Sequence, residues 1–254
     1  METILYVLTF DFWLLFSIGI GSSIIGSMFG AAGLVTIPAM LIVGIPIHLS
    51  IAANKFATGL SAFTNVMTFY RRKSLDLKMT AKQIITGIAG GVCGAFFATQ
   101  LSEHTMNIIA SILLVFSFFI VVISRKYMDE MTPSRQPKST KLVAPFFISI
   151  YDGGFGPGSA TMSITYYLHR SYGYQKAAEF SRVIIFASCF GGFIWFYIQG
   201  LVRWDIAIPV TLGAIIGSHI GILLLPKLNM KWVRLILPLI FLILIAQVFI
   251  ELFF

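Results

Sequence analysis

Charged side chains are scarce in this sequence of 254 residues, of which only 11% are Asp, Glu, Lys or Arg. A soluble domain usually has about a quarter of its residues charged. Hydrophobic residues make up 57% of the chain, and phenylalanine alone occurs 24 times. This composition excludes a disordered chain, a fibrous repeat and an ordinary cytosolic enzyme. It predicts an integral membrane protein with many spans and almost no extramembrane domain.

Cysteine and enzyme motifs are also scarce. The two cysteines, Cys93 and Cys189, lie in apolar runs and lack the spacing of metal ligands or of a disulfide framework. The sequence contains no H-E-x-x-H, no G-x-S-x-G and no phosphate-binding loop. We therefore expect no soluble-enzyme activity, no cofactor and no metal site.

Seven apolar segments are long enough to cross a bilayer, which takes about 20 helical residues. They lie near residues 8–29, 49–70, 83–101, 106–124, 177–198, 206–225 and 233–253. Two further apolar stretches, 34–45 and 142–168, are entered or broken by glycine-rich sequence. Irregular backbone survives at membrane depth only where it is buried in protein or lines a polar cavity. The two breaks are therefore the most informative local features.

The sequence resembles itself at an offset of about 127 residues, where Lys55 falls on Arg182. At one residue less, Phe29-Gly30 falls on Phe155-Gly156. This pattern predicts an all-α polytopic membrane protein with two homologous repeats of four to five helical segments, each starting with a broken or re-entrant segment. The predicted regions are a first transmembrane repeat (1–124), a hydrophilic cytoplasmic linker (125–141) and a second transmembrane repeat (142–254).

The positive residues predict how the repeats are oriented. If the second repeat is inverted, 15 of the 18 Lys and Arg residues lie in inner loops and only Arg203 lies in an outer loop. Parallel repeats would place 11 in inner loops and 5 in outer loops. Because cytoplasmic loops are enriched in Lys and Arg, the inverted arrangement is favoured. The net charge of +8 is then a topology signal and not a nucleic-acid surface.

Two positive residues remain inside the predicted spans, where a charge costs several kcal/mol. Lys55 follows Asn54, and its repeat mate Arg182 follows Ser181 at the same depth of the equivalent helix. The functional interpretation is a pair of cations that flank an anionic substrate between the repeats. The alternatives are snorkelling toward a loop, or neutralisation by a neighbour such as Glu179, three residues before Arg182.

The glycine-rich breaks are candidates for helix N-termini that face a cavity. Such termini present free N–H groups and a partial positive charge, which suit an anion. Close helix packing explains glycines at such positions equally well. The glycines that would let the backbone approach a ligand are Gly30, Gly33, Gly156 and Gly158.

Taken in order, these features resemble the TauE/SafE family of sulfite and organosulfur anion exporters. In the first half the resemblance rests on Gly26-Ser-Met-Phe-Gly30-Ala-Ala-Gly33 and on Ala53-Asn54-Lys55-Phe56-Ala57. In the second half it rests on Gly153-Gly-Phe-Gly156-Pro-Gly158, on Ser181-Arg182 and on Gly200-Leu-Val-Arg203-Trp204-Asp205. The family often carries Lys where this sequence has Arg182. That difference keeps the charge but changes how an oxyanion is bound, because Arg binds bidentately.

The resemblance implies a secondary transporter in a bacterial-type inner membrane. It would export small sulfur-containing anions such as sulfite or organosulfonates by alternating access, with the substrate held between the repeats. The expected partners are this small anion, the lipid bilayer and protons as a candidate coupling ion, with Asp152 and Glu179 as coupling candidates. Two alternatives stay open. One is an intramembrane enzyme acting on a lipid or a modified cysteine, with Asp152 and His169 as acid and base. The other is a non-transporting membrane assembly subunit.

Overall fold

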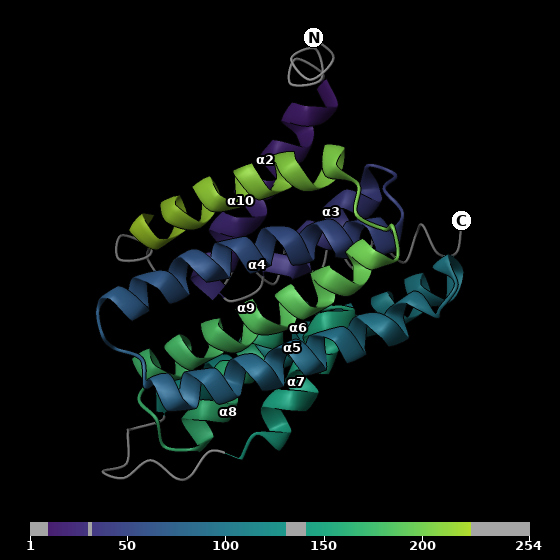
Figure 1. Cartoon of the computed structure of the whole chain (residues 1–254). Helices are drawn as coiled ribbons and strands as arrows, with labels where there is room; N and C mark the ends of the chain where they lie inside the picture. The colour runs from purple at the N-terminus through teal and green to yellow at the C-terminus, as the bar shows by residue number, and fades with distance from the viewer. Residues whose placement is uncertain (1–9, 30–31, 131–140, 225–254) are drawn as a thin grey trace.

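The computed structural model describes residues 10–29, 32–130 and 141–224, and within these ranges it contains nine α-helices and no strand. The helices are α2 (Phe10–Phe29), α3 (Ala32–Ile42), α4 (Ile47–Arg71), α5 (Leu77–Thr99), α6 (Glu103–Glu130), α7 (Val143–Gly154), α8 (Ser159–His169), α9 (Tyr174–Ile198) and α10 (Trp204–Leu224). The all-α prediction is confirmed for this part of the chain (Figure 1). The predicted span at 233–253 lies outside the described residues.

Three of the described helices are long and apolar enough to cross a membrane: α5, α9 and the stretch Trp204–Gly221 of α10. Shorter apolar helices cover Asp11–Gly26, Ala32–Ile42 and Glu103–Ser117. Large apolar side chains such as Ile85, Phe97 and Ile112 are exposed on the outer surface. Soluble monomers rarely expose large apolar patches, whereas lipid contact requires them. These features indicate a membrane protein.

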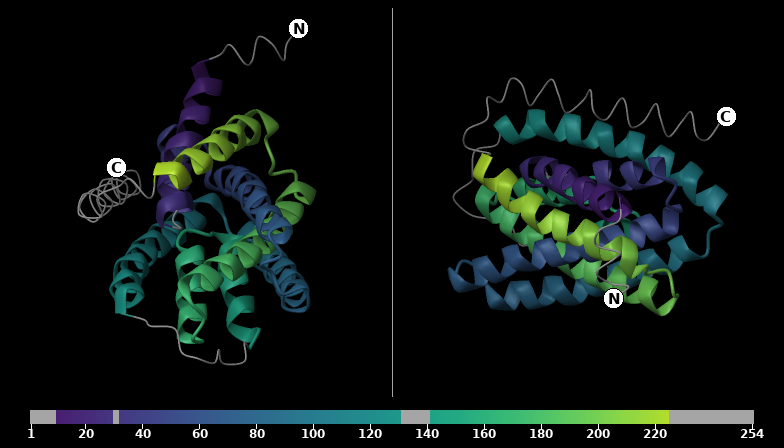
Figure 2. Two further views of the ribbon diagram at one scale, coloured as in Figure 1. Left: turned by 90° about the vertical axis from the view of Figure 1, so that its left-hand side faces the viewer. Right: turned by 90° about the horizontal axis from the view of Figure 1, so that it is seen from above.

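Helices of equal length recur along the chain. α3 and α8 both have 11 residues, α4 and α9 both have 25, and in each pair the starting residues are 127 positions apart. α5 and α10 also begin 127 positions apart. The packing follows the same pattern, since α5 packs against α7, α10 packs against α2, and α4 packs against α9 (Figure 1). In Figure 2, the purple α2 and the yellow-green α10 lie together, away from the α7–α8 pair.

α4 and α9 run in opposite directions. Near the start of α4, His48 Nε2 lies 3.0 Å from the oxygen of Ala98 at the end of α5. Near the end of α9, Trp195 Nε1 donates to Thr99 Oγ1, in the same part of α5, at 3.0 Å. At the other end of the pair, Lys176 in the first turn of α9 donates to the carbonyl of Ser74, just beyond α4. α4 and α9, which stand at equivalent sequence positions, are therefore antiparallel.

The two predicted breaks are helix hairpins. Tyr166 Oη, near the end of α8, donates at 2.6 Å to the carbonyl of Lys141, just before α7. Both ends of the α7–α8 hairpin therefore lie on one side. Asp11 at the start of α2 and Val43 after α3 line one surface pocket, so the α2–α3 hairpin also returns to its own side. Each hairpin has the geometry that a re-entrant segment requires.

Close helix contacts depend on glycine. A Cβ on Gly91 of α5 would collide with the carbonyl of Ser188 in α9, and a Cβ on Gly94 would collide with the carbonyl of Ile150 in α7. The absence of a side chain therefore lets α5 approach both neighbours, as small residues commonly do between membrane helices.

α6 is longer than the sequence analysis predicted. It continues to Glu130, so the first residues of the predicted linker 125–141 are helical. Residues 131–140 of that linker lie outside the described part of the chain. The boundaries of the predicted regions remain a prediction.

Candidate functional site

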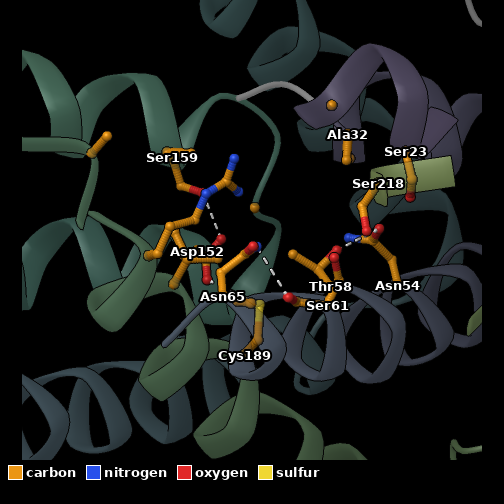
Figure 3. A pocket seen from close by; sticks show the side chains of 18 of the residues that line it. Ser23, Ala32, Asn54, Thr58, Ser61, Asn65, Asp152, Ser159, Cys189 and Ser218 are labelled. Carbon is orange, nitrogen blue, oxygen red and sulfur yellow. Dashed lines mark hydrogen bonds between the residues drawn. The ribbon is translucent and has the colours of Figure 1, made fainter. Parts of the chain in front are cut away.

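A cavity of about 350 Å³ lies where the two hairpins meet α4 and α9. In Figure 3, Asp152 and Ser159 stand on one side of it and Ala32, Asn54 and Ser218 on the other. The α2–α3 hairpin supplies Ser23, Gly26, Ala32 and Gly33, the α7–α8 hairpin supplies Asp152, Gly156, Gly158, Ser159 and Ala160, and α9 supplies Ala178, Arg182, Ile185 and Cys189. Both halves of the chain therefore build one cavity.

α4 lines this cavity with a row of polar side chains spaced three or four residues apart. They are Asn54, Thr58, Ser61, Asn65, Thr68 and Arg72. Residues at this spacing share one face of a helix. The sequence analysis did not name Arg72, Ser61 or Thr68 as candidate site residues. The repeated three-and-four spacing was the signal that could have identified them.

The cavity opens at the C-terminal end of α4. It extends from Asn54, which is buried in the middle of the molecule, to Arg72, which is exposed at the helix C-cap. Five Lys and Arg residues lie between positions 71 and 82, at the end of α4, in the loop that follows it and at the start of α5. An anion that arrives from this side meets Arg72 first.

Lys55 points away from the open cavity and into the α7–α8 hairpin. Its side chain is 1% exposed. Its Nζ donates to the carbonyl of Asp152 and to the carbonyl of Phe155 at 3.3 Å, and it lies 3.7 Å from Asp152 Oδ1. Carbonyls in the last turn of a helix lack helical partners and carry partial negative charge. Lys55 therefore caps α7 and neutralises Asp152.

The carboxylate of Asp152 is fully occupied by donors. Ser159 Oγ donates to its Oδ1 at 2.6 Å, and Ser188 Oγ donates to its Oδ2. Cys189 Sγ lies 3.4 Å from the same Oδ2. Together with Lys55, these groups satisfy both oxygens of a buried charge, which would otherwise be strongly destabilising.

The glycines of the second break build the turn that brings Asp152 and Lys55 together. Gly156 has a φ of +106° and Gly158 a φ of +80°, a region that favours glycine. A Cβ on Gly156 would also lie only 2.5 Å from Lys55 Nζ. These two residues therefore serve the hairpin turn as well as lining the cavity.

Arg182 is partly buried and remains available to a ligand. It lines the cavity, and within residues 10–29, 32–130 and 141–224 its guanidinium makes no hydrogen bond or ion pair. The expected neighbour Glu179 pairs with Lys176 instead, at 2.8 Å. Lys176 lies three residues before Glu179 on the same helix face, so it reaches that carboxylate and leaves Arg182 uncompensated.

Two helix N-termini enter the same cavity. Ala32 and Gly33 belong to the first turn of α3, and Ser159 and Ala160 to the first turn of α8. The first N–H groups of a helix have no helical acceptor and carry partial positive charge. With Arg182 inside and Arg72 at the opening, the cavity is electropositive, because the charge of Asp152 is already neutralised.

The remaining predicted residues lie elsewhere. Ser181 is buried and donates to the carbonyl of Ala160 at 3.1 Å, so its hydroxyl bonds to the backbone of α8 and not to the cavity. Glu179 does not line the cavity either, and Gly30 lies outside the described residues.

The predicted acid–base pair of Asp152 and His169 is not brought together, and no metal site is found in the described part of the chain. Asp152 lies beside Ser159 at the start of α8, whereas His169 is the last residue of that helix. The rise of a helix separates these positions by about 15 Å. Among the described residues, no group of three or more His, Cys, Asp or Glu side chains is placed to hold a metal ion.

A comparison with known protein families identifies the chain. The sequence profile of the family described as "Sulfite exporter TauE/SafE" matches residues 15–248. The chain belongs to this family.

This TauE/SafE family member is similar to several curated proteins. It is 26% identical over 211 residues to a "Probable membrane transporter protein" of Haemophilus influenzae, with 82% of each chain covered. It is 29% identical over 199 residues to "Probable membrane transporter protein ORF9" of Sinorhizobium sp, covering 78% of this chain and 76% of the relative. It is 24% identical over 222 residues to "Probable membrane transporter protein YfcA" of Escherichia coli K12, covering 87% and 82%. No solved structure matches the chain.

The family and the names of these relatives indicate a membrane transporter and argue against an enzyme role.

Proposed function

We propose that this TauE/SafE protein is a secondary transporter that exports small sulfur-containing oxyanions, such as sulfite or an organosulfonate. The observation that carries the proposal is Arg182, a partly buried cation with no hydrogen-bond or ion-pair partner among the described residues, facing a cavity between the two halves. The cavity supports an anion, and the family description supports sulfur as its central atom.

The donors around the cavity suit a small oxyanion. The guanidinium of Arg182 presents two parallel N–H groups to two oxygens of one anion. Asn54, Ser61 and the first turns of α3 and α8 add amide, hydroxyl and backbone donors. The volume of about 350 Å³ is at the lower end of the range for ligand pockets. A small anion with its water shell fills such a space.

The arrangement of the helices supports alternating access between two inverted repeats. α3 and α8 have equal lengths, as do α4 and α9, and α4 and α9 are antiparallel. The tips of the two hairpins meet at the cavity, where a Cβ on Gly33 would lie 3.6 Å from Pro157. Inverted repeats that share a central site are a common plan of secondary transporters. In this proposal the structure is open toward Arg72 and the cytoplasm.

The direction of transport follows from charge. In an inner membrane that is negative inside, outward movement of one negative charge gains about 2.3 kcal/mol per 100 mV. Protons remain the candidate coupling ion, with Asp152 as the carboxylate that borders the cavity.

Flux measurements test this proposal directly. Purified protein in liposomes is loaded with radiolabelled sulfite or sulfoacetate, and efflux is followed under an imposed potential that is negative inside. We expect efflux that increases with the potential and exceeds that of protein-free liposomes, with taurine, a zwitterion, moving more slowly. If neither anion leaves faster than from protein-free liposomes, the proposed function is wrong.

A further inference from the structure

Two sets of residues related by the repeat offset lie where the hairpins meet α4 and α9, and one set holds the Asp152 carboxylate whereas the other holds no carboxylate. The groups that surround the Asp152 carboxylate are Lys55, Ser159, Ser188 and Cys189. The residues 127 positions away from these are Arg182, Ala32, Ser61 and Ala62 respectively. All four of these counterparts line the open cavity.

The counterpart of Asp152 itself is a glycine. At the offset of 126 that aligns the two breaks, Asp152 falls on Gly26, which also lines the cavity. A Cβ on Gly26 would collide with Ala32, so this position holds no side chain. The open set therefore has a cation, one hydroxyl and a helix N-terminus like those around Asp152, but no carboxylate.

A second pair of contacts shows that the correspondence holds in three dimensions. A Cβ on Gly33 would lie 3.4 Å from Asn54 Nδ2, and the residues 127 positions later, Ala160 and Ser181, are joined by a hydrogen bond of 3.1 Å. Each polar side chain thus meets the first turn of the short helix in its own half. Lys55 by contrast reaches the hairpin of the other half, so Arg182 is expected to face the α2–α3 hairpin.

We propose that the transported anion occupies, beside Arg182, the position that corresponds to the Asp152 carboxylate beside Lys55. This inference rests on the proposed function and names the subsite. The head of the anion accepts hydrogen bonds from Arg182, from Ser61 and from the first N–H groups of α3. The ligand class is an oxyanion whose head is about as large as a carboxylate, which includes sulfite, sulfonates and carboxylates.

The difference between the two cations fits this assignment. Lys55 donates hydrogen bonds to two carbonyls and forms an ion pair with one carboxylate oxygen at 3.7 Å, which fixes it in place. Arg182 offers a planar fork that suits one exchangeable oxyanion. Because the Asp152 carboxylate already occupies the position beside Lys55, one cavity binds a single anion.

A carboxylate placed on the protein itself tests the subsite without any substrate. Ser159 Oγ reaches Asp152 Oδ1 at 2.6 Å, so the variant A32D brings a carboxylate to the corresponding place beside Arg182. The matched control A32N has the same shape without the charge. We expect A32D to raise the midpoint of thermal unfolding by at least about 2 °C over A32N. In the R182Q background we expect A32D to have a lower unfolding midpoint than A32N, because the introduced carboxylate then has no cation to pair with. An equal difference in both backgrounds would overturn the proposal.

Ser61 provides a second and independent pair of variants. S61D is expected to be more stable than S61N only while Arg182 is present, so a folding defect of A32D alone does not decide the outcome.

Binding measurements then compare the function of the two Ala32 variants. A32D is expected to bind radiolabelled sulfite or sulfoacetate at least about tenfold more weakly than A32N, because its own carboxylate competes. If wild-type protein binds and A32D binds as A32N does, the subsite is wrong and the proposed function stands. If wild-type protein binds neither anion, the proposed function itself fails.

Discussion

Lys55 and Arg182 stand at equivalent positions of two antiparallel helices, yet they face different surroundings. Lys55 is paired with Asp152 and caps α7. Arg182 faces a cavity and has no hydrogen-bond or ion-pair partner within the described ranges. We attribute the difference to the opposing hairpin, which supplies Asp152 beside Lys55, whereas the residue aligned with Asp152 in the α2–α3 hairpin is Gly26. A cation within a membrane helix is therefore structural or available to a ligand according to the groups that face it, and not according to its depth in the helix.

The energetic consequences also differ. Removing one member of a buried ion pair leaves the other charge uncompensated and typically costs about 3–5 kcal/mol. Removing a cation that faces a polar cavity leaves no buried partner behind. Substitution of Lys55 should therefore act on stability, and substitution of Arg182 should act on ligand binding.

The largest expected effect is on stability. K55M should lower the free energy of unfolding by about 3–5 kcal/mol, because Asp152 stays buried without its cation. The double variant K55M/D152N should recover part of that loss, because it removes both charges. Thermal unfolding in detergent measures both. A K55M protein as stable as wild type would show that the Lys55–Asp152 pair is not structural.

The fold was largely predictable from the sequence, because span length and the repeat offset depend on local composition. The offset of 127 located pairs of helices whose bounds agree with it. The partner of Lys55 was not predictable, because Asp152 lies 97 residues away and reaches Lys55 only through the tip of the α7–α8 hairpin.

The candidate site was predicted in part. Successive residues on a helix point about 100° apart, so sequence neighbours do not share a face. Asn54 therefore lines the cavity while Lys55 leaves it, and Arg182 lines the cavity while Ser181 leaves it. The sequence therefore predicted the depth of each pair of neighbours in its helix, but it did not predict which member of the pair faces the cavity.

The second-largest expected effect is a difference in the rate of cysteine modification between the cavity face and the apolar face of α4. In a protein whose two native cysteines are replaced by serine, N65C lies on the cavity face, and F63C lies on the opposite, apolar face, where Phe63 is 39% exposed. An anionic methanethiosulfonate reagent added at the cytoplasmic side of vesicles should modify N65C at least about tenfold faster, since a charged reagent avoids lipid.

The same reagent also tests to which side of the membrane the cavity opens. Reagent added from the other side of the membrane should modify N65C slowly, because the cavity opens toward Arg72. Faster modification from the outer side would contradict the predicted inward opening.

The smallest effect concerns the opening of the cavity. R72Q should reduce the initial rate of anion uptake by about twofold to fivefold at low salt, since an exposed charge mainly steers the approach of the ligand. The difference between R72Q and wild type should shrink in 0.3 M salt. A loss that is independent of salt would indicate that Arg72 binds the anion directly.

Calorimetric titration of wild-type protein and R182Q with sulfite and sulfoacetate tests the central claim most directly. Arg182 is expected to supply the charge that holds the anion, so R182Q should bind at least about tenfold more weakly, with R182K between the two. The unfolding midpoint of R182Q should stay within about 2 °C of wild type, which separates this effect from that of K55M. A folded R182Q protein that binds either anion within about twofold of wild type would contradict the assignment of the anion site to Arg182.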